Sequence, residues 1–178
     1  MDDIVRAALK KWPQVPACYG WLGLDARGDW YMRDDRVQAA GSFPQVKGSR
    51  LLHEKLREFI HRNYESSADG AWYFQNGPQR VYVELEAAPL VLGVQRQGDG
   101  YAVQAHTGAD AGAVQGAWVD ELGRLFLQTA AGLGLVHSLD MDAAADAVAA
   151  GLWSPQDISF ADLPALFHYQ LSPQRGVT

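Results

Sequence analysis

Three stretches of the chain share one short pattern, in which a glycine and one further residue precede two or three large apolar residues. The pattern occurs at residues 28–32, 70–74 and 123–127. Glycine supplies the positive φ that tight turns require, and aromatic or β-branched residues suit a half-buried, pleated strand. The repetition therefore predicts β-hairpins built on Trp and Tyr.

Further segments between turn residues also have the character of strands. They cover residues 19–25, 29–33, 72–75, 80–86, 90–96, 101–106, 117–121, 124–128 and 133–139. Those between residues 71 and 106 form one meander of four strands. We expect an α+β fold with a mainly antiparallel sheet of roughly seven to nine strands. A curled, barrel-like sheet closed around the main helix is the alternative.

The clearest helical pattern begins at Ser49 and continues to Tyr64. Its apolar stripe recurs at helical spacing and predicts one principal helix packed on the sheet, with His53 and His61 on a solvated face. The core would join this stripe to one face of the strand at 80–86, while Arg80, Tyr82, Glu84 and Glu86 lie on the wet face. The expected core residues are Leu52, Leu56, Phe59 and Ile60 opposite Val81, Val83 and Leu85.

Shorter elements are expected near both ends. Residues 4–12 read as an amphipathic helix stopped by Pro13, and an alanine-rich helix capped by Asp140 or Asp142 continues through residue 150. Residues 154–157 have the form of a helical first turn, with Pro at its first position. Residues 34–48 read as a loop, and alternation near residues 166–171 favours a strand.

Length and charge limit the class of protein. The chain has 178 residues and no long low-complexity segment, so a single globular domain over residues 1–178 is expected. The hairpins at 19–33 and 117–128 resemble each other weakly, which indicates either an internal repeat or, preferably, chance convergence. A formal net charge of −6 argues against nucleic-acid and membrane partners. The single cysteine, Cys18, and the lack of a signal peptide or membrane span predict a soluble cytoplasmic protein.

Motifs that carry chemistry are sparse. No phosphate loop, dinucleotide fingerprint or nucleophile elbow is present, and Cys18 lacks the surroundings of a reactive thiol. His53 and His61 would lie about 12 Å apart along a helix, too far for one metal ion. We therefore expect no metal, no cofactor and no catalytic residues. His106, His137 and His168 could still converge in space.

Aromatic residues give the best indication of function. Trp30-Tyr31 and Trp72-Tyr73 are pairs of adjacent residues on expected strands. Neighbouring residues on a strand face opposite ways, so one member of each pair must be exposed or covered by a helix, a loop or another subunit. This predicts a non-catalytic module that binds a small ligand or a protein partner, and a homodimer closed by the leftover apolar surface. The candidate binding residues are Trp30, Tyr31, Trp72, Tyr73, Tyr82 and Glu84. The alternative is a hydrolase or isomerase that uses Glu84 or Glu86 with a histidine brought near by the fold.

Three segments resemble a known family. They are residues 47–53, 59–64 and 72–83, of which 74–83 is the most specific. In these segments the chain is similar to a family of proteobacterial proteins of about this length and of unknown function. The resemblance spans most of the chain and implies a bacterial protein with no assigned activity and no known site residues.

Overall fold

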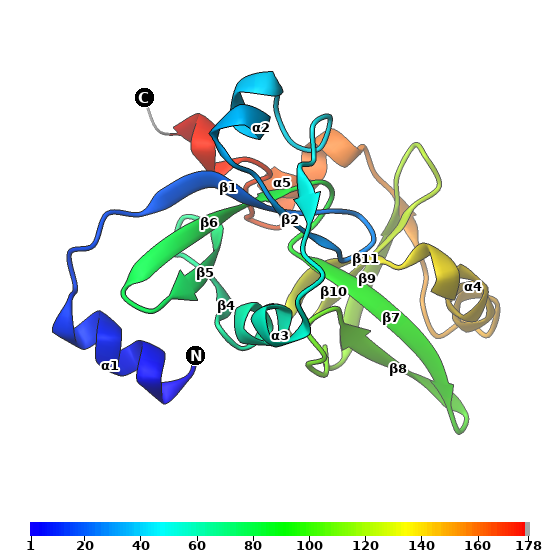
Figure 1. Ribbon diagram of the computed structural model, residues 1–178. Helices are drawn as coiled ribbons and strands as arrows, with labels where there is room; N and C mark the ends of the chain where they lie inside the picture. The colour runs from blue at the N-terminus through cyan, green and yellow to red at the C-terminus, as the bar shows by residue number, and fades with distance from the viewer. Residues whose placement is uncertain (177–178) are drawn as a thin grey trace. The chain divides into compact units, whose positions relative to one another are not determined.

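A computed structural model of the chain describes residues 1–176 and divides them into two compact units (Figure 1). The first unit comprises Met1–Asp25, Asp29–Glu86 and residues 169–176. The second comprises Ala26–Gly28 and Ala87–His168. The expectation of one domain over residues 1–178 stays a prediction.

The first unit contains a six-stranded sheet in the order β3-β2-β1-β6-β5-β4. Neighbouring strands are antiparallel except for β1 and β6, which pair in parallel. Its elements are α1 (Asp3–Lys11), β1 (Cys18–Leu24), β2 (Trp30–Met32), α2 (Asp35–Ala40), β3 (Ser49–Arg50), α3 (Glu54–Arg62), β4 (Tyr64–Ser66), β5 (Trp72–Asn76), β6 (Gln79–Leu85) and the 3-10 helix η3 (Pro173–Gly176).

The second unit contains a six-stranded sheet in the order β12-β9-β10-β11-β7-β8. Here β7 pairs in parallel with β11, and β12 in parallel with β9. Its elements are β7 (Leu90–Gln97), β8 (Gly100–Ala105), β9 (Val114–Val119), β10 (Leu125–Thr129), β11 (Gly132–Val136), η1 (Ser138–Asp140), α4 (Met141–Ala149), β12 (Gln156–Asp157), η2 (Phe160–Asp162) and α5 (Leu163–Leu166).

The two sheets share one arrangement of five strands. In each, a first strand forms an antiparallel hairpin with the second, and the last strand of a three-stranded meander pairs in parallel with the first. The corresponding orders are β2-β1-β6-β5-β4 and β8-β7-β11-β10-β9. The counterpart of the hairpin at 19–33 is therefore β7–β8 rather than the hairpin at 117–128. Whether the weak sequence similarity between the hairpins at 19–33 and 117–128 is an internal repeat or chance convergence is not tested by this arrangement.

The α+β class is confirmed, but the single, mainly antiparallel sheet is wrong. Both sheets are mixed, and the expected meander is divided, because β5–β6 belongs to one sheet and β7–β8 to the other. The division falls at Ala87-Ala88-Pro89, between the second and third strands of the expected meander. A turn signal shows that a strand ends, but not which sheet the next strand joins.

The principal helix is also corrected. Residues Ser49–Arg50 pair with β2 as strand β3, so α3 begins only at Glu54, where the His53 side chain accepts a hydrogen bond from the Leu56 N–H. At nine residues α3 is no longer than α1 or α4. Leu52, expected in the core, is 71% exposed because it precedes the helix, and only Ile60 of the expected stripe on α3 is fully buried.

The shorter elements confirm some of the predictions made from the sequence and correct others. The N-terminal helix and the alanine-rich helix are confirmed as α1 and α4, and Asp140 occupies the N-cap position of α4. The loop predicted at 34–48 contains α2, and the helical turn predicted at 154–157 is instead strand β12. The strand expected near residues 166–171 is wrong: α5 ends at Leu166, and turns and irregular structure follow until η3 begins at Pro173.

Strand β6 lies in the middle of the first sheet, between β1 and β5. Val83 and Leu85 are buried as expected, but Glu84 on the opposite face is only 4% exposed. The expected wet face is therefore wrong at Glu84. Alternation along a strand separates two faces, but burial of either face depends on what packs over it.

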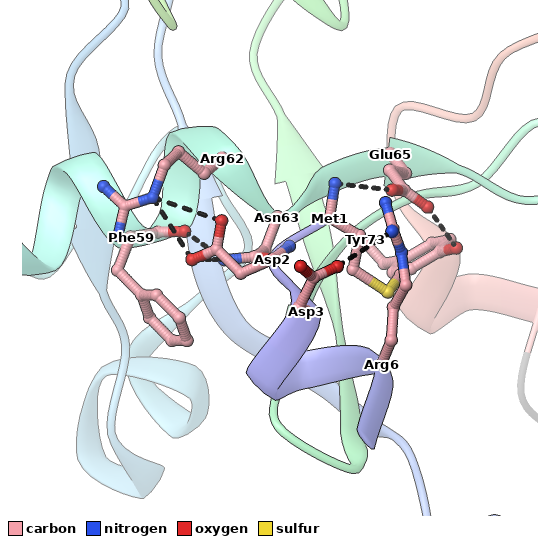
Figure 2. Close-up of polar contacts among 9 residues, drawn as sticks. All are labelled: Met1, Asp2, Asp3, Arg6, Phe59, Arg62, Asn63, Glu65 and Tyr73. Atoms are coloured by element: carbon pink, nitrogen blue, oxygen red, sulfur yellow. Dashed lines mark hydrogen bonds and ion pairs between the residues drawn. The ribbon is translucent and has the colours of Figure 1, made fainter. Parts of the chain in front are cut away.

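Helix α1 is tied to the end of α3 by hydrogen bonds around Asn63, which is fully buried (Figure 2). The Asn63 side chain accepts from the Asp2 N–H at 2.8 Å and donates to the Phe59 carbonyl oxygen at 2.9 Å. Arg62 forms an ion pair with Asp2 at 3.2 Å. At the other end of the segment that precedes β1, the Gln79 side chain donates to the Pro16 carbonyl oxygen at 3.1 Å. The residues before β1 are thus held at both ends.

Within residues 1–176, none of the helices combines the length and the apolar character needed to cross a bilayer.

Candidate functional site

The first unit contains a cavity of about 300 Å³ beside α3 and strands β1, β2, β5 and β6. Three large apolar side chains at this cavity remain partly exposed: Trp21 at 39%, Met32 at 44% and Leu56 at 37%. Large apolar side chains that gather around a concavity are typical of a binding site. The cavity is lined by Cys18, Trp21, Leu22, Met32, Leu56, Ile60, Phe74, Asn76, Gln79 and Val81.

The sheet supplies one wall through its register. Phe74 on β5 and Cys18 on β1 both lie directly opposite Val81 on β6, so the three side chains form a row across the sheet. Leu56 and Ile60 are four residues apart on α3 and therefore share one helix face. This local geometry explains why residues from α3, β1, β5 and β6 meet at one cavity.

Trp21 reaches the cavity because strand β1 is irregular. Adjacent residues of a regular strand face opposite ways, yet both Trp21 and Leu22 line the cavity. The register between β1 and β6 shifts between Cys18 and Leu22, and Gly20 within this shift has a φ of +80°. Such an irregularity re-aims a side chain. Gly20 was the one local signal in the sequence for it.

The cavity is lined by apolar and neutral polar groups. The Cys18 thiol and the amides of Asn76 and Gln79 are polar groups of its lining, and among residues 1–176 no Asp, Glu, Lys or Arg lines it. The Gln79 amide nitrogen is engaged with the Pro16 carbonyl oxygen. The cavity can therefore take an apolar body and a neutral polar group, but offers no counter-ion to a charged ligand.

Of the predicted binding residues, Trp30 and Trp72 both contact the ring of Tyr64. Trp30 is 1% exposed and meets the Tyr64 ring edge-on at 5.2 Å, and Trp72 lies 4.8 Å from the same ring. The Trp30 indole N–H donates to Nε2 of His61 at 2.9 Å. The expectation that His61 lies on a solvated face is therefore wrong, because its ring is the acceptor for a buried indole. Removing that acceptor should lower the free energy of unfolding by about 1–3 kcal/mol, because a buried N–H group then loses its hydrogen-bond acceptor.

The Trp30–His61 bond predicts a dependence of stability on pH. Burial lowers the pKa of His61 below its ordinary value of 6.5, and Arg57 lowers it further. As the pH falls below about 6.5, the unfolded chain takes up a proton that the folded chain resists. Stability is thus full above that pH and declines below it until the folded-state pKa is reached. We expect His61→Gln, which keeps an acceptor but does not titrate, to flatten this decline in urea unfolding measured from pH 7 to 5. An equal decline in both proteins would contradict the assignment.

Tyr73 and Tyr82 form a second cluster with Tyr19 and Arg80. The rings of Tyr19 and Tyr82 stack at 4.7 Å, and the Arg80 guanidinium lies 4.0 Å from the Tyr73 ring centre. The Tyr73 hydroxyl donates to Glu65 at 3.3 Å. Burial raises the pKa of Tyr73 and of Tyr19, so both phenols stay protonated at neutral pH. This cluster packs aromatic rings and presents no activated base.

Tyr31 lies beside an ion-pair cluster centred on Lys47. The Lys47 ammonium contacts Asp25 at 3.0 Å and Glu86 at 3.2 Å, and it lies 5.4 Å from the Tyr31 ring centre. Burial by itself lowers the pKa of Lys47, but the hydrogen bonds to Asp25 and Glu86 outweigh it and hold that pKa above its ordinary value. Lys47 therefore stays charged and is a poor nucleophile.

The two carboxylates that the sequence suggested as an acid and base pair have different cations. Glu86 pairs with Lys47, whereas Glu84 interacts electrostatically with the buried Arg33. Glu84 does not line the cavity beside α3. His106 and His137 line one cavity in the second unit, and His168 is not part of its lining. Among residues 1–176 no group of three or more His, Cys, Asp or Glu side chains is placed to hold a metal ion.

Comparisons with known proteins identify a family and a fold. Residues 1–174 match the model of the family described as "Protein of unknown function (DUF2946)". No curated protein matches. A crystal structure of a DUF1285 family protein from Silicibacter pomeroyi DSS-3 is similar, with a TM-score of 0.51, 15% identity, and coverage of 82% of this chain and 84% of that one. A DUF1285 family protein from Shewanella baltica OS155 aligns with a TM-score of 0.46, 16% identity and coverage of 71% and 91%. At such identities the first match shows the fold alone.

Proposed function

We propose that this chain, which belongs to the family described as "Protein of unknown function (DUF2946)", is a non-catalytic module. It binds a small, uncharged and largely apolar ligand in the cavity beside α3. The observation that carries the proposal is the cavity of about 300 Å³ around which Trp21, Met32 and Leu56 remain partly exposed. Its volume is at the lower end of the range for ligand cavities, about 300–1,000 Å³. The ligand is therefore small.

The lining also favours a particular chemistry. An apolar body would contact Leu22, Phe74 and Val81, while a hydroxyl or amide group would reach the Asn76 side chain. A charged group would be desolvated there without a counter-ion, which is costly. Indole and 1-naphthol have the required size and character and serve as probes.

Methionine methyl groups offer a direct readout of this site. The chain has three methionines, Met1, Met32 and Met141, and only Met32 lines the cavity. In a ¹³C-methyl-methionine NMR titration, we expect indole or 1-naphthol to shift the Met32 signal while the other two stay in place. Trp21→Ala should weaken binding about five-fold, corresponding to about 1 kcal/mol of lost aromatic contact.

Trp12 supplies the matched control, because it is 50% exposed in the same unit but does not line the cavity. Trp12→Ala should leave the affinity unchanged. Equal weakening by both variants, or equal shifts of all three methyl signals, would contradict the proposal. A Met32 shift on dilution of the protein alone would favour the predicted homodimer, with a second copy occupying the cavity.

The enzyme alternative stays a prediction with less support. It requires Glu84 or Glu86 beside a histidine, and the contacts described above give these carboxylates Arg33 and Lys47 as partners.

A further inference from the structure

The second unit contains a groove of about 280 Å³ along the outer edge of strand β9. One wall is formed by residues 114–118 of β9, and the other by residues of the segment 152–156, which leads into β12. The two walls meet where Gln156 pairs in parallel with Trp118. Before this pair, no residue of the segment pairs with β9 within residues 1–176, so a space stays open between them. The volume is near the lower end of the range for ligand sites, about 300–1,000 Å³, so a ligand there is small.

Two indole rings belong to this groove, and each packs against another aromatic ring of the same unit. Trp118 meets Phe167 edge-on, with the ring centres 4.7 Å apart, and Trp153 lies 6.1 Å from the ring centre of Tyr101 on β8. Both tryptophans are half-buried, so part of each ring remains accessible. A ring that is already held in place loses little conformational entropy when a ligand packs on it.

Gly116 leaves room for the Trp118 ring. The two residues are two positions apart on β9 and share a face, and a Cβ at Gly116 would overlap the far end of the indole. Gly116 has no positive φ, so its backbone does not require glycine. Glycine in a strand often marks the close approach of another group. This glycine therefore allows the indole to lie against the strand, beside the groove.

The polar side chains of the groove are neutral. They are the amides of Gln115 and Gln156 and the hydroxyl of Ser154, and none of them forms a hydrogen bond within residues 1–176. Amides and hydroxyls both donate and accept hydrogen bonds. No Asp, Glu, Lys or Arg from the described part of the chain lines the groove. A charged ligand would thus find no counter-ion, whereas a ligand with several hydroxyl groups would find matching partners.

The charge of the second unit also argues against anionic ligands. This unit has nine Asp and Glu residues against three Arg and no Lys, so its formal charge of −6 equals that of the whole chain. The summed negative field repels phosphate and carboxylate groups. A cationic ligand would require a carboxylate in the groove, where none lies. The ligand is therefore neutral.

We propose that this groove binds a neutral saccharide, with a sugar ring packed on Trp153 and its hydroxyl groups bonded to Gln115 and Gln156. A pyranose ring has C–H groups on its faces and hydroxyl groups around its rim. The C–H groups suit the negative face of an indole, and each hydroxyl can both donate to an amide oxygen and accept from an amide N–H. An extended peptide added to the edge of β9 fits less well, because the pairing of Gln156 with Trp118 closes the groove at one end. This site is separate from the apolar cavity of the first unit and goes beyond the proposed function.

The test is a titration of protein carrying ¹⁵N in its tryptophan indoles with maltose or, separately, cellobiose. We expect saturable shifts of the Trp118 and Trp153 N–H signals, while the signals of Trp12 and Trp21 in the first unit stay in place. Trp21 lines the apolar cavity, so its unchanged signal separates this site from the proposed function. Glucose should bind more tightly than glucose 6-phosphate at equal ionic strength, because the phosphate adds negative charge.

Two pairs of variants probe the geometry. Trp153→Ala should weaken disaccharide binding about ten-fold, whereas Trp12→Ala, which removes an exposed indole from the first unit, should not. Gln115→Ala should weaken it about five-fold, whereas Gln95→Ala, which shortens an exposed glutamine on β7 outside the groove, should not. Gln115 is exposed, so its substitution tests the groove even where the loss of Trp153 unfolds the unit.

Several results would overturn the proposal. These are the absence of saturable shifts with both disaccharides, tighter binding of glucose 6-phosphate than of glucose, or equal losses in Gln115→Ala and Gln95→Ala. Saturation of the Trp118 and Trp153 signals by an acetylated and amidated valine tripeptide, with neither disaccharide bound, would identify the edge of β9 as a site of strand addition instead.

Discussion

Arg33→Ala is expected to lower the free energy of unfolding by about 3–5 kcal/mol, the typical cost of removing one partner from a buried charge pair. Arg33 is 2% exposed, and its guanidinium donates to the carbonyl oxygens of Val46, Gly20 and Gly41 at 3.3, 3.1 and 2.6 Å. Its positive charge also interacts electrostatically with the carboxylate of the buried Glu84. Alanine would leave three carbonyl groups without this donor and would remove a positive charge that acts on the buried Glu84. Urea unfolding at pH 7 measures the loss.

Arg50 supplies the control for this prediction. It forms an ion pair with Asp29 at 2.8 Å, but its side chain is 53% exposed. Water screens such a pair, so Arg50→Ala should cost less than about 1 kcal/mol. If Glu84 is the main uncompensated group, Glu84→Gln in the Arg33→Ala background should recover part of the loss. Similar costs for Arg33→Ala and Arg50→Ala would show that the buried guanidinium does not hold this part of the fold together.

Leu127→Ala should cost about 2–5 kcal/mol through lost burial and the cavity left behind. Leu127 is fully buried on β10, a strand with neighbours on both sides. Its cross-strand partners are Ala117 and Gly134, which have no long side chains that could move into the space. The upper part of the range is therefore expected, measured by chemical unfolding.

Leu122 tests the same chemistry in the opposite environment. It lies in the turn between β9 and β10 and is 73% exposed. Leu122→Ala removes the same atoms from a side chain already in water and should cost less than about 0.5 kcal/mol. Comparable losses in the two variants would mean that the burial of this hairpin is wrongly assigned.

The local elements could be predicted from the sequence to a large extent. The strands at 72–76, 79–85, 90–97 and 100–105 were each placed to within one or two residues. The turns at Gly28 and Gly123 were correct because both glycines have positive φ, +82° and +75°, which a local signal specifies. Helix α4 was correct for a similar reason, since its alanines, its N-terminal aspartates and Gly151 act within the helix itself.

The candidate site was predicted only in part. Aromatic residues were expected to form it, but Trp30 and Tyr73 are buried by the chain's own elements, and Tyr82 stacks on Tyr19. The cavity beside α3 is instead lined by Trp21 and Met32, neither of which was among the candidate binding residues. Which aromatic side chain reaches the cavity depends on the register shift in β1, because this shift brings Trp21 to the same face as Leu22.

Local patterns in the chain are sufficient to place most strands and turns and two of the helices, because φ preferences, alternation and capping act over a few neighbouring residues. The pairing of the strands, in contrast, follows from the folded chain. Long-range contacts assign β6 and β7 to different sheets, make Ser49–Arg50 a strand, bury Glu84 and align Gly93 with Gln104. These outcomes depend on contacts between residues far apart in the chain, and such contacts override local preference where the packing and hydrogen bonds they provide are worth more.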